Sequence, residues 1–192
     1  MKISRYNILT TVVVIAIAIS IPFLISGATT TSQQQTNTPY NIFSPEVPTK
    51  INFAGKEIDV RRYDLRERLD RELTAFTYMH STTLLMIKRA NRYFPIVEPI
   101  LKENGVPDDF KYLMTIESNL DTRARSPRGA AGLWQFMDTT GKEFGLEVNA
   151  NVDERYHIEK ATRAACRYLK QAYAKYGDWM SVAASYNAGQ RR

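Results

Sequence analysis

Apolar positions recur at helical spacing along most of the chain after residue 60. In "RRYDLRERLDRELTAFTYMH" they fall three or four residues apart, as expected for one face of an amphipathic helix. That face consists of Tyr63, Leu65, Leu69, Leu73 and Phe76. The segment "DERYHIEKATRAACRYLKQAYAKYG" shows the longest clear pattern of this kind, and Gly177 closes it in the manner of a helix C-terminus. We therefore expect an all-α protein.

Proline and glycine divide the middle of the chain. Pro95 and Pro99 punctuate a separate helix, predicted over residues 95–104, which stops at Gly105. The segment "VPDDFKYLMTIES" starts a new helix, with Asp108 or Asp109 near its N-terminus, where a carboxylate suits the helix dipole.

Less regular segments follow this helix. Residues 119–131, "NLDTRARSPRGAA", combine Asn, Asp, Ser-Pro and Gly and are predicted to form a loop. The stretch "GLWQFMDTTGKEFG" is predicted to form two short helical turns, and "DWMSVAASYNAGQRR" to start a last helix.

The N-terminal third has a different organisation. Lys2 and Arg5 precede an uncharged, mostly apolar run at residues 8–25, which indicates either a cleaved secretory signal or a single membrane anchor. We assign residues 1–28 to this segment and residues 29–50, rich in Thr, Ser, Gln and Pro, to a flexible linker. Either outcome exports the remainder of the chain, because the positive charges stay inside.

Residues 51–60, "INFAGKEIDV", alternate weakly between apolar and polar positions around a glycine. This pattern is compatible with a short strand or an extended arm, so we expect at most a minor β element there. Residues 51–106 are then expected to form a mainly helical N-terminal part.

Composition and charge narrow the function classes. The 192 residues are 44% hydrophobic and 24% charged, with a net charge of +6. Acidic and basic residues alternate, as in "DLRERLDREL", which favours a solvated helix face over a nucleic-acid surface. The single Cys166 excludes an intramolecular disulfide and fits a small buried hydrophobe. His80 and His157 lie far apart in the sequence, so we expect neither a metal nor another cofactor.

Glu117 is the first candidate for chemistry. It lies where the apolar run "YLMTI" turns polar at Ser118, and Leu113 and Met114 share its side of the helix at i−4 and i−3. A carboxylic acid at such a boundary can have a raised pKa, which suits a general acid near neutral pH. The stretch alone is also compatible with an ordinary surface glutamate near a helix end.

Two further stretches bear on this choice. "GAAGLWQFMDTTG" sets an aromatic residue and an amide among glycines, which suits sugar binding, although Trp134 and Phe136 are equally compatible with core positions. "AASYNAG" places Tyr186 and Asn187 at the end of an apolar helix. A second acid, as two-carboxylate glycosidases need, is not obvious: Asp121 lies in the loop and Asp138 fits a helix cap.

The motifs "ES" at residues 117–118, "GLWQFM" at 132–137 and "ASYNAG" at 184–189 occur in one order and spacing. Together they resemble the soluble lytic transglycosylase family, the goose-type-lysozyme-like murein transglycosylases, from about Pro107 to Gly189. "RSPRGAAGLWQFMDTTGKEFGL" is most similar to the membrane-bound murein transglycosylase D subgroup. The resemblance implies a mainly helical, lysozyme-like transglycosylase domain over residues 107–192. Because the family domain normally continues past "YNAG", we expect this catalytic core to be truncated at its C-terminal end.

The resemblance also implies a reaction. Members of the family are lyases that cleave the bond between N-acetylmuramic acid and N-acetylglucosamine in peptidoglycan and leave 1,6-anhydro ends. They use one carboxylate as general acid and base, which Glu117 matches, and no cofactor. By the same analogy the substrate-binding residues are Ser118, Gln135, Met137, Tyr186 and Asn187.

The expected partners are peptidoglycan strands, with membrane association through the N-terminal segment and no nucleic acid. A basic surface also suits an anionic cell-wall polymer. The expected location is the periplasm or the outer face of the membrane. Two alternatives stay open: an inactive or truncated tethered glycan-binding protein, and a hydrolytic lysozyme-like muramidase.

Overall fold

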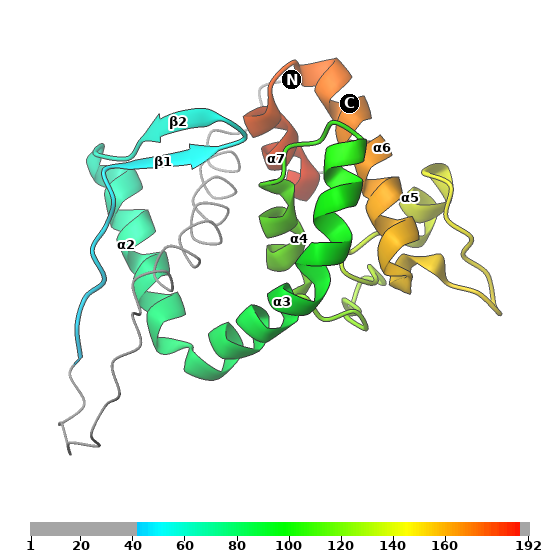
Figure 1. Cartoon of the computed structure of the whole chain (residues 1–192), viewed down its shortest axis with the longest axis horizontal. Helices are drawn as coiled ribbons and strands as arrows, with labels where there is room; N and C mark the ends of the chain where they lie inside the picture. Colours follow the sequence, from blue (N-terminus) through cyan, green and yellow to red (C-terminus); the bar gives the residue numbers. More distant parts are fainter. Residues whose placement is uncertain (1–41, 189–192) are drawn as a thin grey trace.

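The computed structural model describes residues 42–188, apart from the side chains of the last two of them. The predicted signal or anchor, most of the linker and the residues after 188 lie outside this part. The described chain is mainly helical and includes one small antiparallel sheet, as predicted (Figure 1).

The β element near residues 51–60 is a hairpin. Strand β1 (Lys50–Phe53) pairs with β2 (Lys56–Asp59) in antiparallel register, with Ile51 opposite Ile58. Ala54 and Gly55 form a two-residue turn and both have positive φ, at 52° and 77°. Such turns match the right-handed twist of the two strands, which explains why the glycine stands there.

Helix α2 (Tyr63–Tyr78) follows the hairpin and packs under it. Leu65, Leu69 and Leu73 are buried, as the periodicity predicts. They belong to a small core cluster consisting of Val47, Ile51, Val60, Leu65, Leu69 and Leu73. The prediction was wrong for Tyr63, which is 79% exposed because it occupies the first residue of the helix, beyond the reach of this cluster.

Helix α3 (His80–Glu103) contains both Pro95 and Pro99, so the predicted separate helix over residues 95–104 does not exist. With 24 residues, α3 is longer than the 19-residue helix before Gly177, which has the longest clear helical pattern in the sequence. Each proline removes one backbone hydrogen bond, which bends a helix without necessarily ending it. Both prolines are exposed, while Val97, Ile100 and Leu101 are buried and hold the helix to the core. Figure 1 shows that α3 is bent along its length.

The remaining helices form the larger part of the molecule. They are α4 (Phe110–Ser118), the short α5 (Asp138–Glu143), a 3₁₀ turn η1 (Glu154–Tyr156), α6 (Ile158–Tyr176) and α7 (Trp179–Ala188). The segment "GLWQFMDTTGKEFG" contains one short helix instead of two turns, because its first half is an irregular loop. Residues 119–131 also form a loop, as predicted.

One hydrophobic core joins these elements. It includes residues from the C-terminal half of α3 and from α4, α6 and α7, and Cys166 is fully buried in it, as predicted. The hairpin contacts this core at its tip, where Phe53 packs against Phe110 with ring centroids 5.5 Å apart. The Ala54 amide there donates to the Asp109 carboxylate, at 2.6 Å. The N-terminus of α4 is thus fixed to the hairpin, and its C-terminus carries Glu117.

Candidate active site

Helix α4 positions Glu117 in its last turn. Leu113 and Met114, one turn earlier, are fully buried and anchor that side of the helix in the core. The helix ends immediately afterwards, because Asn119 and Leu120 adopt left-handed backbone conformations with φ of 49° and 56°. Asparagine tolerates this conformation, whereas leucine does so at a cost that its complete burial offsets. The carboxyl group therefore lies at a strained, tightly packed helix end.

The environment of Glu117 favours the neutral acid. Burial raises the pKa of its carboxyl from 4.5 to about 7. Its Oε1 atom is buried and has no hydrogen-bond partner among the described residues. Buried polar atoms are nearly always paired, so an unpaired one commonly marks a position that receives a ligand or water. Burial therefore gives the Glu117 carboxyl the raised pKa that its position in the sequence suggested.

Tyr186 from α7 is close enough to Glu117 to sense its charge. Burial raises the pKa of the Tyr186 hydroxyl well above 10, and the Glu117 carboxylate raises it further. The hydroxyl donates to the Trp134 carbonyl oxygen at 2.7 Å. The ring makes an edge contact with Tyr168, with centroids 5.2 Å apart. The Tyr186 hydroxyl is therefore already bonded to the protein and stays protonated near neutral pH.

The other predicted site residues have different settings. Ser118 is buried, and its hydroxyl donates back to the Met114 carbonyl oxygen at 3.1 Å. Gln135 donates through Nε2 to the carbonyl oxygens of Gly132 and Ala124, at 2.8 and 3.2 Å. Met137 is 42% exposed at the start of α5, and the side chain of Asn187 lies outside the described part of the chain. The loop over residues 119–137 begins two residues after Glu117 and contains Gln135. Its Trp134 carbonyl oxygen accepts the hydrogen bond from Tyr186.

The aromatic residues of "GLWQFM" are core residues. Trp134 is fully buried, and its indole N–H donates to the Thr162 hydroxyl of α6 at 3.0 Å. Phe136 is also buried and makes an edge contact with Tyr168. Of the two interpretations that the sequence left open, packing is correct for both side chains. Their burial fixes the Trp134 carbonyl that Tyr186 contacts.

The fit of this loop against η1 depends on Gly132. Its φ is +75°, and a Cβ atom built there would lie 1.9 Å from the carbonyl oxygen of Arg155. Only glycine allows so close a backbone approach.

Arg155 itself is a buried cation that binds the same loop. Its guanidinium donates to the carbonyl oxygens of Gly129 and Phe136, at 2.9 and 3.1 Å, and pairs with Asp153 at 2.6 Å. Sequence reasoning did not select Arg155. The only signal is the spacing of Asp153 and Arg155, which is common among surface ion pairs.

This geometry agrees with the comparison to known families. Residues 94–192 match the transglycosylase SLT domain family, and this segment is just over half of the 192 residues. The chain belongs to this family. The match begins inside α3, at the half of that helix which packs in the main core, and it extends through α7.

Two curated relatives illustrate the similarity. Membrane-bound lytic murein transglycosylase D of Escherichia coli (strain K12) is 32% identical over 129 residues, which cover 67% of this chain and 28% of that protein. Peptidoglycan transglycosylase gp16 of Escherichia phage T7 is 35% identical over 92 residues, which cover 46% of this chain and 7% of that protein. The chain therefore corresponds to little more than a quarter of the first relative's length.

Asp121 and Asp138, the two other carboxylates that the sequence brought into question, each have a basic partner of their own. Asp121 accepts from the Arg123 amide at 2.9 Å and lies 3.7 Å from the Arg89 guanidinium. Asp138 pairs with Lys142 at 2.8 Å within α5. Its predicted role as a helix cap was wrong, because Met137 occupies the cap position and Asp138 is the first helical residue.

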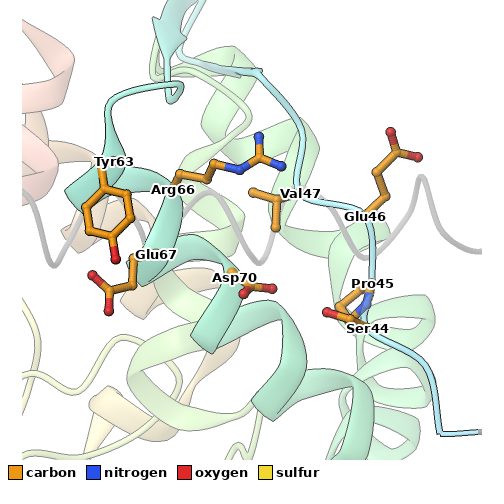
Figure 2. Close-up of a pocket in the computed structure, with 8 residues that line it drawn as sticks. All are labelled: Ser44, Pro45, Glu46, Val47, Tyr63, Arg66, Glu67 and Asp70. Atoms are coloured by element: carbon orange, nitrogen blue, oxygen red, sulfur yellow. The ribbon is translucent and has the colours of Figure 1, made fainter.

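A cavity of about 430 Å³ lies away from these residues, between the segment 44–47 and α2 (Figure 2). Its lining mixes acidic and basic groups with small apolar ones: Ser44, Pro45, Glu46, Val47, Tyr63, Arg66, Glu67 and Asp70. It contains none of the predicted site residues.

Two other findings concern residues 42–188 only. No group of three or more His, Cys, Asp or Glu side chains is placed there to hold a metal ion. No helix in that range has both the length and the apolarity to cross a membrane, and the apolar run at 8–25 lies outside it.

Proposed function

We propose that the chain carries the glycan-cleaving domain of an exported peptidoglycan lytic transglycosylase, with Glu117 as the single general acid and base. The observation that carries this proposal is the Glu117 carboxyl, whose pKa burial raises to about 7 and whose Oε1 has no partner among the described residues. The family membership and the names of the two relatives support the substrate class.

In the first step, protonated Glu117 donates its proton to the glycosidic oxygen between N-acetylmuramic acid and N-acetylglucosamine. A general acid works best when its pKa is near the working pH, and about half of the Glu117 carboxyls are protonated at pH 7. The C1–O bond breaks, and the acetamido group of the muramic acid stabilises the oxocarbenium-like centre.

In the second step, the Glu117 carboxylate takes the proton from the 6-hydroxyl of the same muramic acid. That oxygen attacks C1 and closes a 1,6-anhydro ring, which returns the carboxyl to its protonated state. The step needs no second carboxylate, which agrees with the engagement of Asp121 by Arg89 and of Asp138 by Lys142.

The remaining predicted residues are proposed to form the walls of the glycan site. Met137 is exposed and suits contact with a sugar face. Gln135 and Tyr186 are proposed to hold the loop that borders the acid, and Ser118 to fix the end of α4 through its bond to Met114. Asn187 stays a proposal by resemblance alone.

Export and membrane association are part of the proposal. They rest on the apolar run at residues 8–25 with Lys2 and Arg5 before it. The domain would then act in the periplasm or on the outer face of the membrane.

The test is digestion of purified peptidoglycan by the wild-type chain and by Glu117→Gln, followed by chromatographic and mass analysis of the fragments. We expect wild type to release fragments with 1,6-anhydro ends. Glu117→Gln keeps the shape of the side chain but has no acidic proton to transfer, so cleavage should fall at least a hundredfold.

Other outcomes would refute the proposal. Reducing ends would assign a hydrolytic muramidase. Binding of peptidoglycan by wild type without cleavage would assign a glycan-binding protein. Full activity of Glu117→Gln would show that a different group is the acid.

A further inference from the structure

The loop that follows Glu117 carries three exposed arginines, Arg123, Arg125 and Arg128. Between Ser118 and Met137 the only carboxylate is Asp121, which faces Arg89. None of the three arginines forms an ion pair with a residue in the described part of the chain. We name residues 123–128 the arginine loop.

The charges of the hairpin and α2 are arranged differently. There, most cations face a carboxylate close by in sequence or across the hairpin. The pairs are Lys50–Glu57, Arg61–Asp59, Arg62–Asp64 and Arg71–Glu72. Within the described part of the chain, the three arginines of this loop therefore lack the ion-pair partner that most cations of the hairpin and α2 have.

The arginine loop is held in a fixed shape. The Ser126 hydroxyl accepts from the Ala130 amide at 3.0 Å, and the Ser126 amide donates to the Ala130 carbonyl oxygen at 2.9 Å. Arg125 pairs with Ala131 as a β-bridge, and the Ala124 carbonyl oxygen accepts from Gln135. A rigid loop loses little conformational entropy when it binds, so its side chains are prepared for a ligand.

Its position places it at the border of the proposed glycan site. The loop connects the end of α4, which carries Glu117, to the segment with Gln135 and Met137. The proposed function places the cleaved bond at Glu117, six residues before Arg123 in the chain. The N-acetylated sugar backbone has no charge, whereas the peptide stems attached to muramic acid carry free carboxylates. Arginine suits such groups because its guanidinium binds a carboxylate through two parallel hydrogen bonds.

We propose that Arg123, Arg125 and Arg128 bind the carboxylates of the peptide stems of peptidoglycan and so favour strands that carry stems. This inference rests on the proposed function, because it assumes that the glycan lies at Glu117. It adds a substrate preference that the acid alone does not provide.

The test measures binding instead of cleavage. The full chain with Glu117→Gln is mixed with peptidoglycan, and the protein remaining in solution after sedimentation gives the affinity. One sample of peptidoglycan is untreated. In the other, the stem carboxylates are converted to amides with a carbodiimide and excess ammonia, which leaves the glycan and the peptides in place.

We expect the untreated polymer to bind about tenfold more tightly than the amidated one, since three exposed charge pairs each contribute modestly. The loop variant replaces all three arginines with glutamine (Arg123→Gln, Arg125→Gln and Arg128→Gln). It should bind both samples with equal affinity. That affinity should be about tenfold weaker than the affinity of the unchanged loop for untreated polymer. The three side chains are exposed, so thermal unfolding should be unchanged. Replacing the same three arginines with lysine keeps the charge but removes the paired hydrogen bonds, so the preference should fall to an intermediate value.

A matched control removes the same charge elsewhere. Lys102, Lys170 and Lys175 are exposed on α3 and α6, outside residues 117–137. Changing all three to glutamine should leave the preference for untreated polymer intact.

The proposal is overturned if the protein with the unchanged loop binds both polymers equally, or if the loop variant keeps the preference for untreated polymer. It is also overturned if the control with Lys102, Lys170 and Lys175 changed to glutamine loses that preference as completely as the loop variant. Because this assay needs no cleavage, its failure is separate from that of the proposed function, which the peptidoglycan digestion decides.

Discussion

The protonation of Glu117 depends on the side chains that keep water and competing donors away from it. Leu113 and Met114 close one side, and Tyr186, whose hydroxyl is bonded to the Trp134 carbonyl oxygen, stands near the carboxyl. An ionised carboxylate in such surroundings loses solvation without gaining a partner, which raises its pKa. These surroundings suit one acid only. A second ionised carboxylate beside Glu117 would itself need a nearby positive charge to offset its loss of solvation.

Tyr186→Phe removes one hydroxyl and leaves the ring. The Trp134 carbonyl then loses its donor, so we expect the free energy of unfolding to fall by about 1–2 kcal/mol. Denaturant titration followed by circular dichroism measures this change. Tyr173→Phe is the matched control, since the Tyr173 ring stacks on Trp179 and its hydroxyl bonds to no described residue. That variant should change stability by less than about 0.5 kcal/mol; an equal loss in both would contradict the role of the Tyr186 hydrogen bond.

Among the elements, the loop over residues 119–137 is the one that builds the site. Buried Trp134 fixes it to α6, Arg155 binds two of its carbonyl groups, and Gly132 lets it approach η1. Three of its residues, Asn119, Leu120 and Gln135, have positive φ without being glycine. Such strained conformations concentrate at functional sites, where the surrounding structure imposes them.

Gly132→Ala should disrupt this loop. The new Cβ would meet the Arg155 carbonyl oxygen at 1.9 Å, so backbone must move, and we expect a loss of at least about 3 kcal/mol of stability. Gly105→Ala is the control: its φ is +67°, but a Cβ there meets no atom within 4 Å. The left-handed conformation alone should cost about 1 kcal/mol. Similar midpoints of denaturation for the two variants would show that the close approach to Arg155 is unimportant.

Local sequence signals predicted the elements well where one face is buried. The apolar spacing and the terminal residues placed α4 and the C-terminal end of α6 close to their observed limits, but η1 occupies the predicted start of α6. The signals failed at α3, because Pro95 and Pro99 lie on its exposed face and bend the helix instead of ending it. They also failed at "GLWQFM", where apolar residues at helical spacing pack as an irregular loop. The reason is the contact with Arg155, which is distant in sequence.

For the whole molecule, the packing of the hairpin on α4 was not predictable from local patterns. Nothing in residues 51–60 indicates that the Ala54 amide binds Asp109 or that Phe53 packs on Phe110. For the candidate site, the position of Glu117 and the three motifs predicted an acid there, and burial raises its pKa to about 7. The buried cation Arg155 was not predicted, because a charged residue within two positions of an aspartate usually lies on the surface.

The stability of the molecule should depend on pH through Glu117. Its pKa is about 7 in the folded protein and 4.5 when exposed, so folding favours the protonated form. The stability that folding gains from the protonated Glu117 carboxyl is complete below about pH 4.5 and is lost as the pH rises through 7. A pKa difference of that size corresponds to about 3 kcal/mol. We expect the free energy of unfolding of wild type, relative to Glu117→Gln, to fall by roughly that amount between pH 4.5 and pH 8.

Denaturant titrations of the two proteins at a series of pH values measure this difference. The other titrating groups are common to both chains and cancel. A constant difference across the range would mean that the folded structure does not favour the protonated carboxyl.

The most direct test of the account is the titration of the Glu117 carboxyl itself. In protein labelled with ¹³C at the glutamate carboxyl carbons, the signal missing from the Glu117→Gln spectrum identifies this residue, and its chemical shift is followed from pH 3 to pH 9. The account predicts a midpoint near pH 7, because burial without a hydrogen-bond partner disfavours the ionised form. A midpoint near 4.5, the ordinary value for glutamate, would contradict it, since the carboxyl would then be ionised at neutral pH and could not serve as the acid.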